Sequence, residues 1–189
     1  MNYYALMCKL TDNTAILTHG LNLVSPFNNW LDPVPWSIPV PEPLQIEVRS
    51  TGKMLPYYDN PIPVMTADLL ETIRAAGVDN IKDYEVVINN PFDGSTYNEY
   101  RAINIIGAIK AIDEDLSESD ELDESGGGSG IKFYDEIILD ESKIHGALLF
   151  RLAEQLSYVV IAECIKDAIL SKGNPEDFYF KPLFEESDD

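Results

Sequence analysis

The sequence predicts an α+β fold built mainly from an antiparallel sheet, with a few helices packed on it. Segments typical of strands outnumber segments typical of helices, and no strand–helix–strand unit repeats along the chain. Hydrophobic residues make up 45% of the sequence, with ten Tyr, seven Phe and two Trp, which excludes a globally disordered chain. At 189 residues the chain is long enough to bury a substantial core, and we expect one domain.

The first third of the chain predicts two strands on either side of an extended arm. Residues 2–10, NYYALMCKL, and residues 44–50, LQIEVRS, alternate in the manner of strands. Six of the twelve prolines lie between residues 26 and 43. Because proline fixes its own torsion and cannot donate a ladder hydrogen bond, this stretch is expected to be neither a helix nor a central strand. Trp30 and Trp36 lie within it, where they either pin the arm onto the domain or anchor a partner.

The middle of the chain contains the clearest helix. Thr66 is a good N-cap, Asp68 suits the positive end of the helix, and Gly77 stops it. Strands are expected at 83–88 and from residue 100 to about 106, and NNPFDG between them predicts a turn. The apolar stripe of the helix consists of Leu69, Leu70, Ile73 and Ala76.

The last third predicts further strands and a second helix. Strands are expected at 131–139, 147–152 and 157–162, and the last of these is short and apolar. Residues 163–173 predict a helix closed by Gly173. A final strand at 177–183 precedes the acidic tail 185–189.

The cysteines and the N-terminus indicate a cytoplasmic protein. Cys8 and Cys164 each lie among apolar residues, so we expect two free, buried thiols rather than a disulfide. The N-terminus lacks the charged-then-apolar order of a signal peptide. No window approaches the run of about eighteen apolar residues that a membrane-spanning helix requires, so no membrane contact is expected.

The formal net charge of −20 restricts the class of partner. Recognition of phosphate needs clustered Lys and Arg, so direct binding of nucleic acid or of anionic lipid is not expected. Either a basic protein partner complements the charge, or the charge serves only to keep the protein soluble.

The negative charge is most concentrated between Asp113 and Glu124, where eight of twelve residues are Asp or Glu. As a calcium-binding loop starting at Asp113, this segment fails at its sixth position, which needs glycine and holds Glu118, and at its eighth, which is normally apolar and holds Asp120. No metal or cofactor is therefore expected. The crowded like charges and the following GGGSG predict a mobile acidic loop at 118–130. Its candidate partner-binding residues are Asp120, Glu121, Asp123 and Glu124.

The sequence contains no recognisable catalytic constellation. The nucleophile-elbow, zinc-protease, phosphate-loop and dinucleotide-binding motifs do not occur in it. His19 and His145 each precede a glycine in a turn-like context. The apolar setting of Cys8 is expected to raise its pKa and make it a poor nucleophile. These observations predict that the protein is not an enzyme.

Several segments between Asp59 and Phe184 follow one another in an order that carries a family resemblance. They are PVMTADLLETIRAAGVDNI (63–81), YNEYRAINIIGAIKAIDEDLS (97–117), IILDESKIHGALLFRL (137–152), VVIAECIKDAILSKG (159–173) and FYFKPL (178–183). In this order they resemble the immunity protein 11 family of bacterial polymorphic toxin systems. Within the family pattern, Phe150 and Arg151 look like core and structural positions, and Asp113 with Ser117 is expected to close the preceding structured segment. The acidic stretch after Ser117 departs from the pattern, and the proline-rich arm falls outside it.

The resemblance implies a cytoplasmic protein that is encoded beside a secreted toxin, binds that toxin and blocks it in the producing cell. On this interpretation residues 59–184 form the immunity-like region, residues 1–58 are an N-terminal part of the same domain, and the partner is a basic toxin whose active or substrate-binding surface is occluded. Two alternatives stay open. One is a small enzyme or ligand-binding domain with a site made of carboxylates, and the other is an acidic mimic of nucleic acid that captures basic proteins in general.

Overall fold

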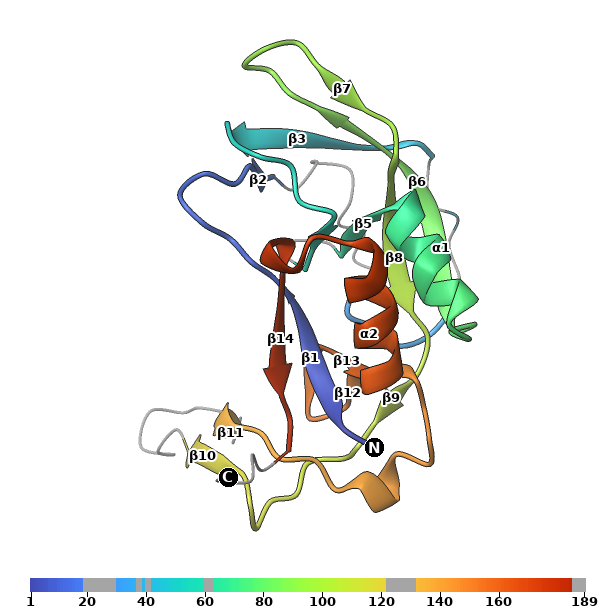
Figure 1. The fold of residues 1–189 in the computed structure, drawn as a ribbon, viewed down its shortest axis with the longest axis vertical. Helices are drawn as coiled ribbons and strands as arrows, with labels where there is room; N and C mark the ends of the chain where they lie inside the picture. The colour runs from blue at the N-terminus through green and yellow to red at the C-terminus, as the bar shows by residue number, and fades with distance from the viewer. Residues whose placement is uncertain (19–29, 37–38, 40–41, 60–62, 122–131, 185–189) are drawn as a thin grey trace.

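The computed structural model describes residues 1–18, 30–36, 39, 42–59, 63–121 and 132–184. In this part of the chain, two β-sheets, a separate two-stranded hairpin and two α-helices form an elongated molecule (Figure 1). Nearly all strand pairs are antiparallel. The predicted α+β class with mainly antiparallel pairing is therefore confirmed, although the strands divide between two sheets.

The first sheet joins the two ends of the sequence. Among the described residues its strand order is β14–β1–β13–β12–β9, and β9 and β12 form its parallel pair. Strand β1 therefore lies between two strands from the end of the chain, so the N-terminal segment forms an interior strand of the sheet. The strands are β1 (Tyr3–Cys8), β9 (Ala108–Ile109), β12 (Leu149–Leu152), β13 (Gln155–Ala162) and β14 (Phe178–Pro182).

The second sheet is formed by the middle of the chain. Its described strands follow the order β2–β3–β6–β8–β5–β4, with β7 also paired to β6, and β3 runs parallel to β6. The strands predicted at 44–50, at 83–88 and from residue 100 are confirmed as β3, β6 and β8. The strands are β2 (Ile16–Leu17), β3 (Leu44–Ser50), β4 (Tyr57–Tyr58), β5 (Val64–Thr66), β6 (Ile81–Asn89), β7 (Thr96–Tyr97) and β8 (Tyr100–Ile105).

Both predicted helices are present, and they lie side by side (Figure 1). Helix α1 (Ala67–Ala75) begins after Thr66, whose hydroxyl accepts a hydrogen bond from the Leu69 backbone N–H at 3.4 Å. Gly77 ends this helix with a φ of 106°, a conformation that costs glycine little. Helix α2 (Glu163–Lys172) ends differently: the φ of Gly173 is −92°, and a Cβ at that position would lie 2.9 Å from the Phe178 ring. Close packing, not a left-handed cap, therefore requires this glycine.

The first sheet is covered on both faces, which explains the apolar run in β13. Val159 and Ile161 pack into the same cluster as the helices, whereas Val160 and Ala162 pack into a cluster on the opposite face. Successive residues of a strand point to opposite faces, so a strand that is covered on both sides must be apolar at every position. The helix cluster also includes Ile103 and Ile105 of the second sheet, so the helices join the two sheets into one core.

Three local expectations differ from the structure. Glu118–Glu121 forms strand β10, paired antiparallel with β11 (Lys132–Glu136), so a strand begins where the acidic loop was expected. The strand predicted at 131–139 ends at Glu136, and a 3₁₀ turn follows at Glu141–Lys143. Both cysteines are free, but Cys8 is half-buried and Cys164 is exposed, because Cys164 lies on the outer side of α2. Residues 122–131, the tail 185–189, His19 and much of the proline-rich arm lie outside the described residues.

Candidate functional site

The acidic residues predicted to bind a partner belong to strand β10 or to the segment that follows it. Asp120 and Glu121 pair through their backbones with Phe133 and Lys132 of β11. Asp123 and Glu124 lie outside the described residues. The structure thus places the first two on a hairpin that lies below the first sheet in Figure 1.

The base of this hairpin is tied to the body of the protein through Ile138. The Asp113 backbone N–H donates to the Ile138 carbonyl at 2.9 Å. The Ser117 hydroxyl donates to the same carbonyl at 3.1 Å and accepts from the Ile138 N–H at 2.9 Å. The Asp113 carboxylate accepts from the backbone N–H groups of Asp115 and Leu116. The expectation that Asp113 and Ser117 close the preceding structured segment is confirmed.

Like charges face each other across the hairpin. Glu118 pairs with Glu136, and both side chains are exposed. Like charges that stand directly opposite on paired strands repel each other. Neither glutamate forms an ion pair with another described residue. Together with the exposed Asp135, these carboxylates contribute negative charge to the hairpin, and Lys181 donates to the Asp135 carbonyl beside them at 3.0 Å.

The two tryptophans pack against the second sheet. Trp36 stacks on Tyr84 with ring centroids 4.9 Å apart, and Trp30 meets Trp36 edge to face at 4.3 Å. The Trp30 carbonyl accepts a hydrogen bond from Nη2 of Arg151 at 2.8 Å. Trp30 is only 6% exposed, so it pins its segment onto the domain, as one of the two interpretations expected. Trp36 is half-buried, and its contact with a partner stays a prediction.

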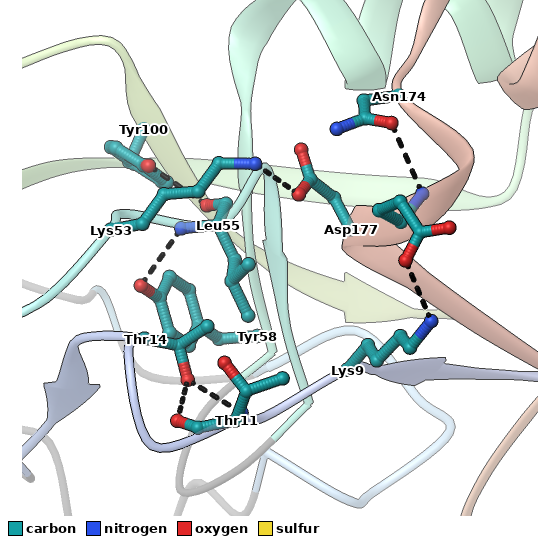
Figure 2. A network of polar contacts seen from close by, with 10 residues as sticks. Lys9, Thr11, Thr14, Lys53, Leu55, Tyr58, Tyr100, Asn174 and Asp177 are labelled. Atoms are coloured by element: carbon teal, nitrogen blue, oxygen red, sulfur yellow. Dashed lines mark hydrogen bonds and ion pairs between the residues drawn. The ribbon is translucent and has the colours of Figure 1, made fainter.

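A polar network joins the two sheets beside β14 (Figure 2). Lys53 forms an ion pair with Asp177, and Asp177 is only 9% exposed. Asp177 ends the 3₁₀ turn Pro175–Asp177 directly before β14, whereas Lys53 lies between β3 and β4 of the second sheet. Lys9 and Glu176 form a second, exposed ion pair at 3.2 Å. The Lys53–Asp177 pair bridges the two sheets, whereas the Lys9–Glu176 pair joins the ends of the neighbouring strands β1 and β14 within the first sheet.

Two tyrosines support the Lys53 side of this network. The Tyr58 hydroxyl accepts from the Leu55 N–H at 3.0 Å, and the Tyr100 hydroxyl donates to the Leu55 carbonyl at 2.8 Å (Figure 2). Burial raises the pKa of Tyr58 to about 12 and raises the pKa of Tyr100 as well. Both phenols are therefore neutral at physiological pH and serve as hydrogen-bonding groups.

Neither of the remaining candidate reactive residues, Cys8 and His145, lies in surroundings typical of a catalytic site. The Cys8 thiol donates to Oδ1 of Asp59 at 3.1 Å, and burial raises its pKa to about 12, so the prediction that Cys8 is a poor nucleophile is supported. His145 lies in a turn with a φ of 54°. Within the described parts of the chain, no three His, Cys, Asp or Glu side chains come together in an arrangement that could hold a metal ion.

The family model of the immunity protein family Imm11 matches residues 3–183. The chain belongs to this family. The match starts at the first residue of β1. It therefore includes the N-terminal strand and the proline-rich segment, whereas the family resemblance seen in the sequence motifs covered only the region from Asp59 to Phe184. A search among curated proteins found no match. Membership in an immunity protein family indicates a toxin-neutralising role with a toxin as partner, and it favours a non-enzymatic role.

The LFRL segment of this Imm11 protein is buried in its interior. Phe150 is 2% exposed, and Arg151 is fully buried although it carries a guanidinium. Arg151 donates from Nη1 to the Leu156 carbonyl at 2.6 Å as well as from Nη2 to Trp30, and burial lowers its pKa. The core and structural roles that the resemblance implied for both residues are therefore confirmed. None of the described helices is long and apolar enough to cross a membrane.

Sequence reasoning missed the contacts between the sheets in this Imm11 protein. Lys53 and Asp177 are 124 residues apart, and neither stands in a motif. One local signal was available: Asn174 before Pro175 is a typical start for a helical turn, and its side chain accepts from the Glu176 N–H at 3.2 Å. That signal predicts the turn but not the lysine that it meets.

Proposed function

We propose that this protein binds a cognate, basic toxin in the cytoplasm of the producing cell and neutralises it by covering the toxin's active or substrate-binding surface. Family membership supports the immunity role. The observation that favours a basic partner is the β10–β11 hairpin, where the exposed Glu118 and Glu136 stand opposite each other. A cationic surface that docks there would relieve the repulsion between the two carboxylates.

The net charge of −20 should also increase the rate at which this protein and a basic toxin associate. A strongly acidic protein attracts a basic toxin over a distance of about one Debye length, roughly 8–10 Å at physiological ionic strength. Charges at the rim of an interface accelerate association more than they strengthen the final complex. Fast capture suits an inhibitor that must find its toxin before the toxin finds its substrate.

The alternative of a small enzyme or ligand-binding domain receives less support. A carboxylate-based site would gather acidic groups with perturbed pKa values in a concave pocket. The largest upward pKa shifts instead belong to Cys8 and to the tyrosines Tyr57, Tyr58 and Tyr100. The main cause of each shift is burial of the side chain. The described carboxylates with perturbed pKa values, Asp93 and Asp140, accept hydrogen bonds within their own turns.

Co-expression tests the immunity role. The toxin domain encoded by the neighbouring reading frame is induced alone or together with this protein, and growth is followed. We expect the toxin to stop growth and this protein to restore it through a stable complex that co-purifies. Normal growth of cells that express the toxin domain alone, or continued killing when both proteins are soluble, would contradict the proposal.

Charge reversal tests the acidic segment. We expect lysine at Asp120, Glu121, Asp123 and Glu124 to slow association with the purified toxin about tenfold or more at low salt while changing the melting temperature little, because rim charges act mainly on the rate of encounter. Biolayer interferometry at several salt concentrations measures the rate. The control carries lysine at four exposed carboxylates elsewhere: Asp12, Glu47, Asp79 and Glu85. An equal slowing in both variants would show that only net charge matters.

A further inference from the structure

A groove of about 460 Å³ lies between α1 and α2, the two helices that Figure 1 shows side by side. The N-terminal half of α1 forms one wall and the C-terminal end of α2 forms the other. Figure 1 places these helices away from the β10–β11 hairpin, so the groove and the hairpin are separate surfaces that can be altered independently. Its volume lies within the range of pockets that hold small ligands or large side chains.

The floor of the groove is apolar and belongs to the core. Leu69, Ile169 and Phe178 line it, and their side chains are 7%, 1% and 4% exposed. All three pack in the cluster that joins the helices to both sheets. The floor is therefore held in place by the fold, and an occupant with a hydrocarbon portion would meet apolar atoms there, although the floor itself has little surface left to bury.

The rim of the groove is charged, and its charged side chains form no ion pair with another residue that the structure describes. Asp68 and Glu71 are exposed and lie three residues apart on α1, so they share one face of that helix. Neither side chain forms an ion pair or a hydrogen bond with any other described residue. Lys172 stands on the opposite wall, also without an ion pair to a described residue.

We infer that the groove between α1 and α2 receives an arginine side chain from the surface of the toxin, and this inference rests on the immunity function proposed above. The three methylenes of arginine would cover the apolar floor, and the guanidinium would reach the Asp68 and Glu71 carboxylates. Repulsion from Lys172 directs the cation toward the α1 wall. Arginine suits two neighbouring carboxylates better than lysine because its planar fork of donors can bond both.

A binding measurement with the purified toxin domain, inactivated in its own active site, tests this inference. In the D68N/E71Q variant both carboxylates become amides of nearly the same shape. We expect the Kd from isothermal titration calorimetry to rise about tenfold or more, because the guanidinium loses both ionic acceptors. The matched control, D12N/E47Q, removes the same charge from exposed positions outside the groove and should change the Kd less than about twofold. Melting temperatures confirm that both variants fold.

A double-mutant cycle identifies the occupant. Toxin arginines are replaced one at a time by alanine, and one replacement should weaken binding to the wild-type protein but not to D68N/E71Q. Unchanged affinity of D68N/E71Q, equal loss in the control variant, or coupling to a lysine or an aromatic residue instead of an arginine would overturn the groove assignment alone. Failure of the wild-type protein to bind the toxin would instead overturn the proposed function, and the groove assignment with it.

Discussion

Replacing Gly52 by alanine should destabilise the protein strongly, because another part of the backbone occupies the space that a side chain would need. A Cβ at this position would lie 2.4 Å from the Thr14 carbonyl carbon, 2.6 Å from the Ala15 nitrogen and 2.7 Å from the Asn13 oxygen. The last two atoms are hydrogen-bonding groups. The Ala15 N–H donates to the Lys53 carbonyl at 2.9 Å, and the Lys53 N–H donates to the Asn13 carbonyl at 2.7 Å.

The expected loss follows from these contacts. Forcing an extra carbon into a packed site costs about 1–3 kcal/mol, and each of the two backbone hydrogen bonds contributes about 1 kcal/mol. The lower entropy of the unfolded alanine chain offsets about 0.5 kcal/mol. Displacement of Lys53 would also weaken its ion pair with Asp177, and because the Lys53 side chain is 55% exposed we add less than about 1 kcal/mol for it. The free energy of unfolding should therefore fall by about 2.5–5.5 kcal/mol.

Urea unfolding followed by tryptophan fluorescence measures this loss, and a thermal melt should show a fall in Tm of about 5–22 °C for a chain of this length. The control is Gly94→Ala at the turn between β6 and β7, where nothing lies within 4 Å of the added carbon and only the φ of 76° is unfavourable. That variant should lose about 1–2 kcal/mol. If Gly52→Ala lost no more than Gly94→Ala at an unchanged m-value, the reasoning from backbone contact would be refuted.

Two further predictions concern the buried titratable groups. Burial raises the pKa of Cys8 from 9.0 to about 12 and the pKa of Tyr58 from 10.0 to about 12. Both groups therefore ionise more readily in the unfolded chain than in the folded protein. The stability that they contribute below pH 9 should be lost as the pH rises toward 12. Urea unfolding at pH 8, 10 and 11 measures this decline, and a constant free energy of unfolding across that range would contradict it. At pH 7.5 a maleimide should label the exposed Cys164 at least about 100-fold faster than Cys8, whose thiolate is scarce. Mass spectrometry of the labelled peptides measures which cysteine reacts first. The Cys164→Ser variant should lose the fast phase of labelling.

Most of the secondary structure could be predicted because its signals are local. The Thr66 cap, the left-handed Gly77 and the alternating strand β3 each depend on neighbours within a few residues. Of the candidate site, the sequence predicted only the base of the β10–β11 hairpin, where Asp113 and Ser117 form hydrogen bonds with Ile138. Strand β10 was not predictable, because its acidic residues have low strand propensity and are held by pairing with β11.

The sequence by itself determined the composition of the surface and the class of the fold: a net charge of −20, a chain with more strands than helices, and a family resemblance in the segments around LFRL. Only the tertiary structure decided which groups meet. It divided the strands between two sheets and a hairpin, set Lys53 against Asp177 and buried Arg151 beneath Trp30. It also placed Asp68 and Glu71 at the rim of an apolar groove, without an ion pair to any residue that the structure describes. The physical reason is that long-range packing places these groups, so no pattern of near neighbours in the chain records their contacts.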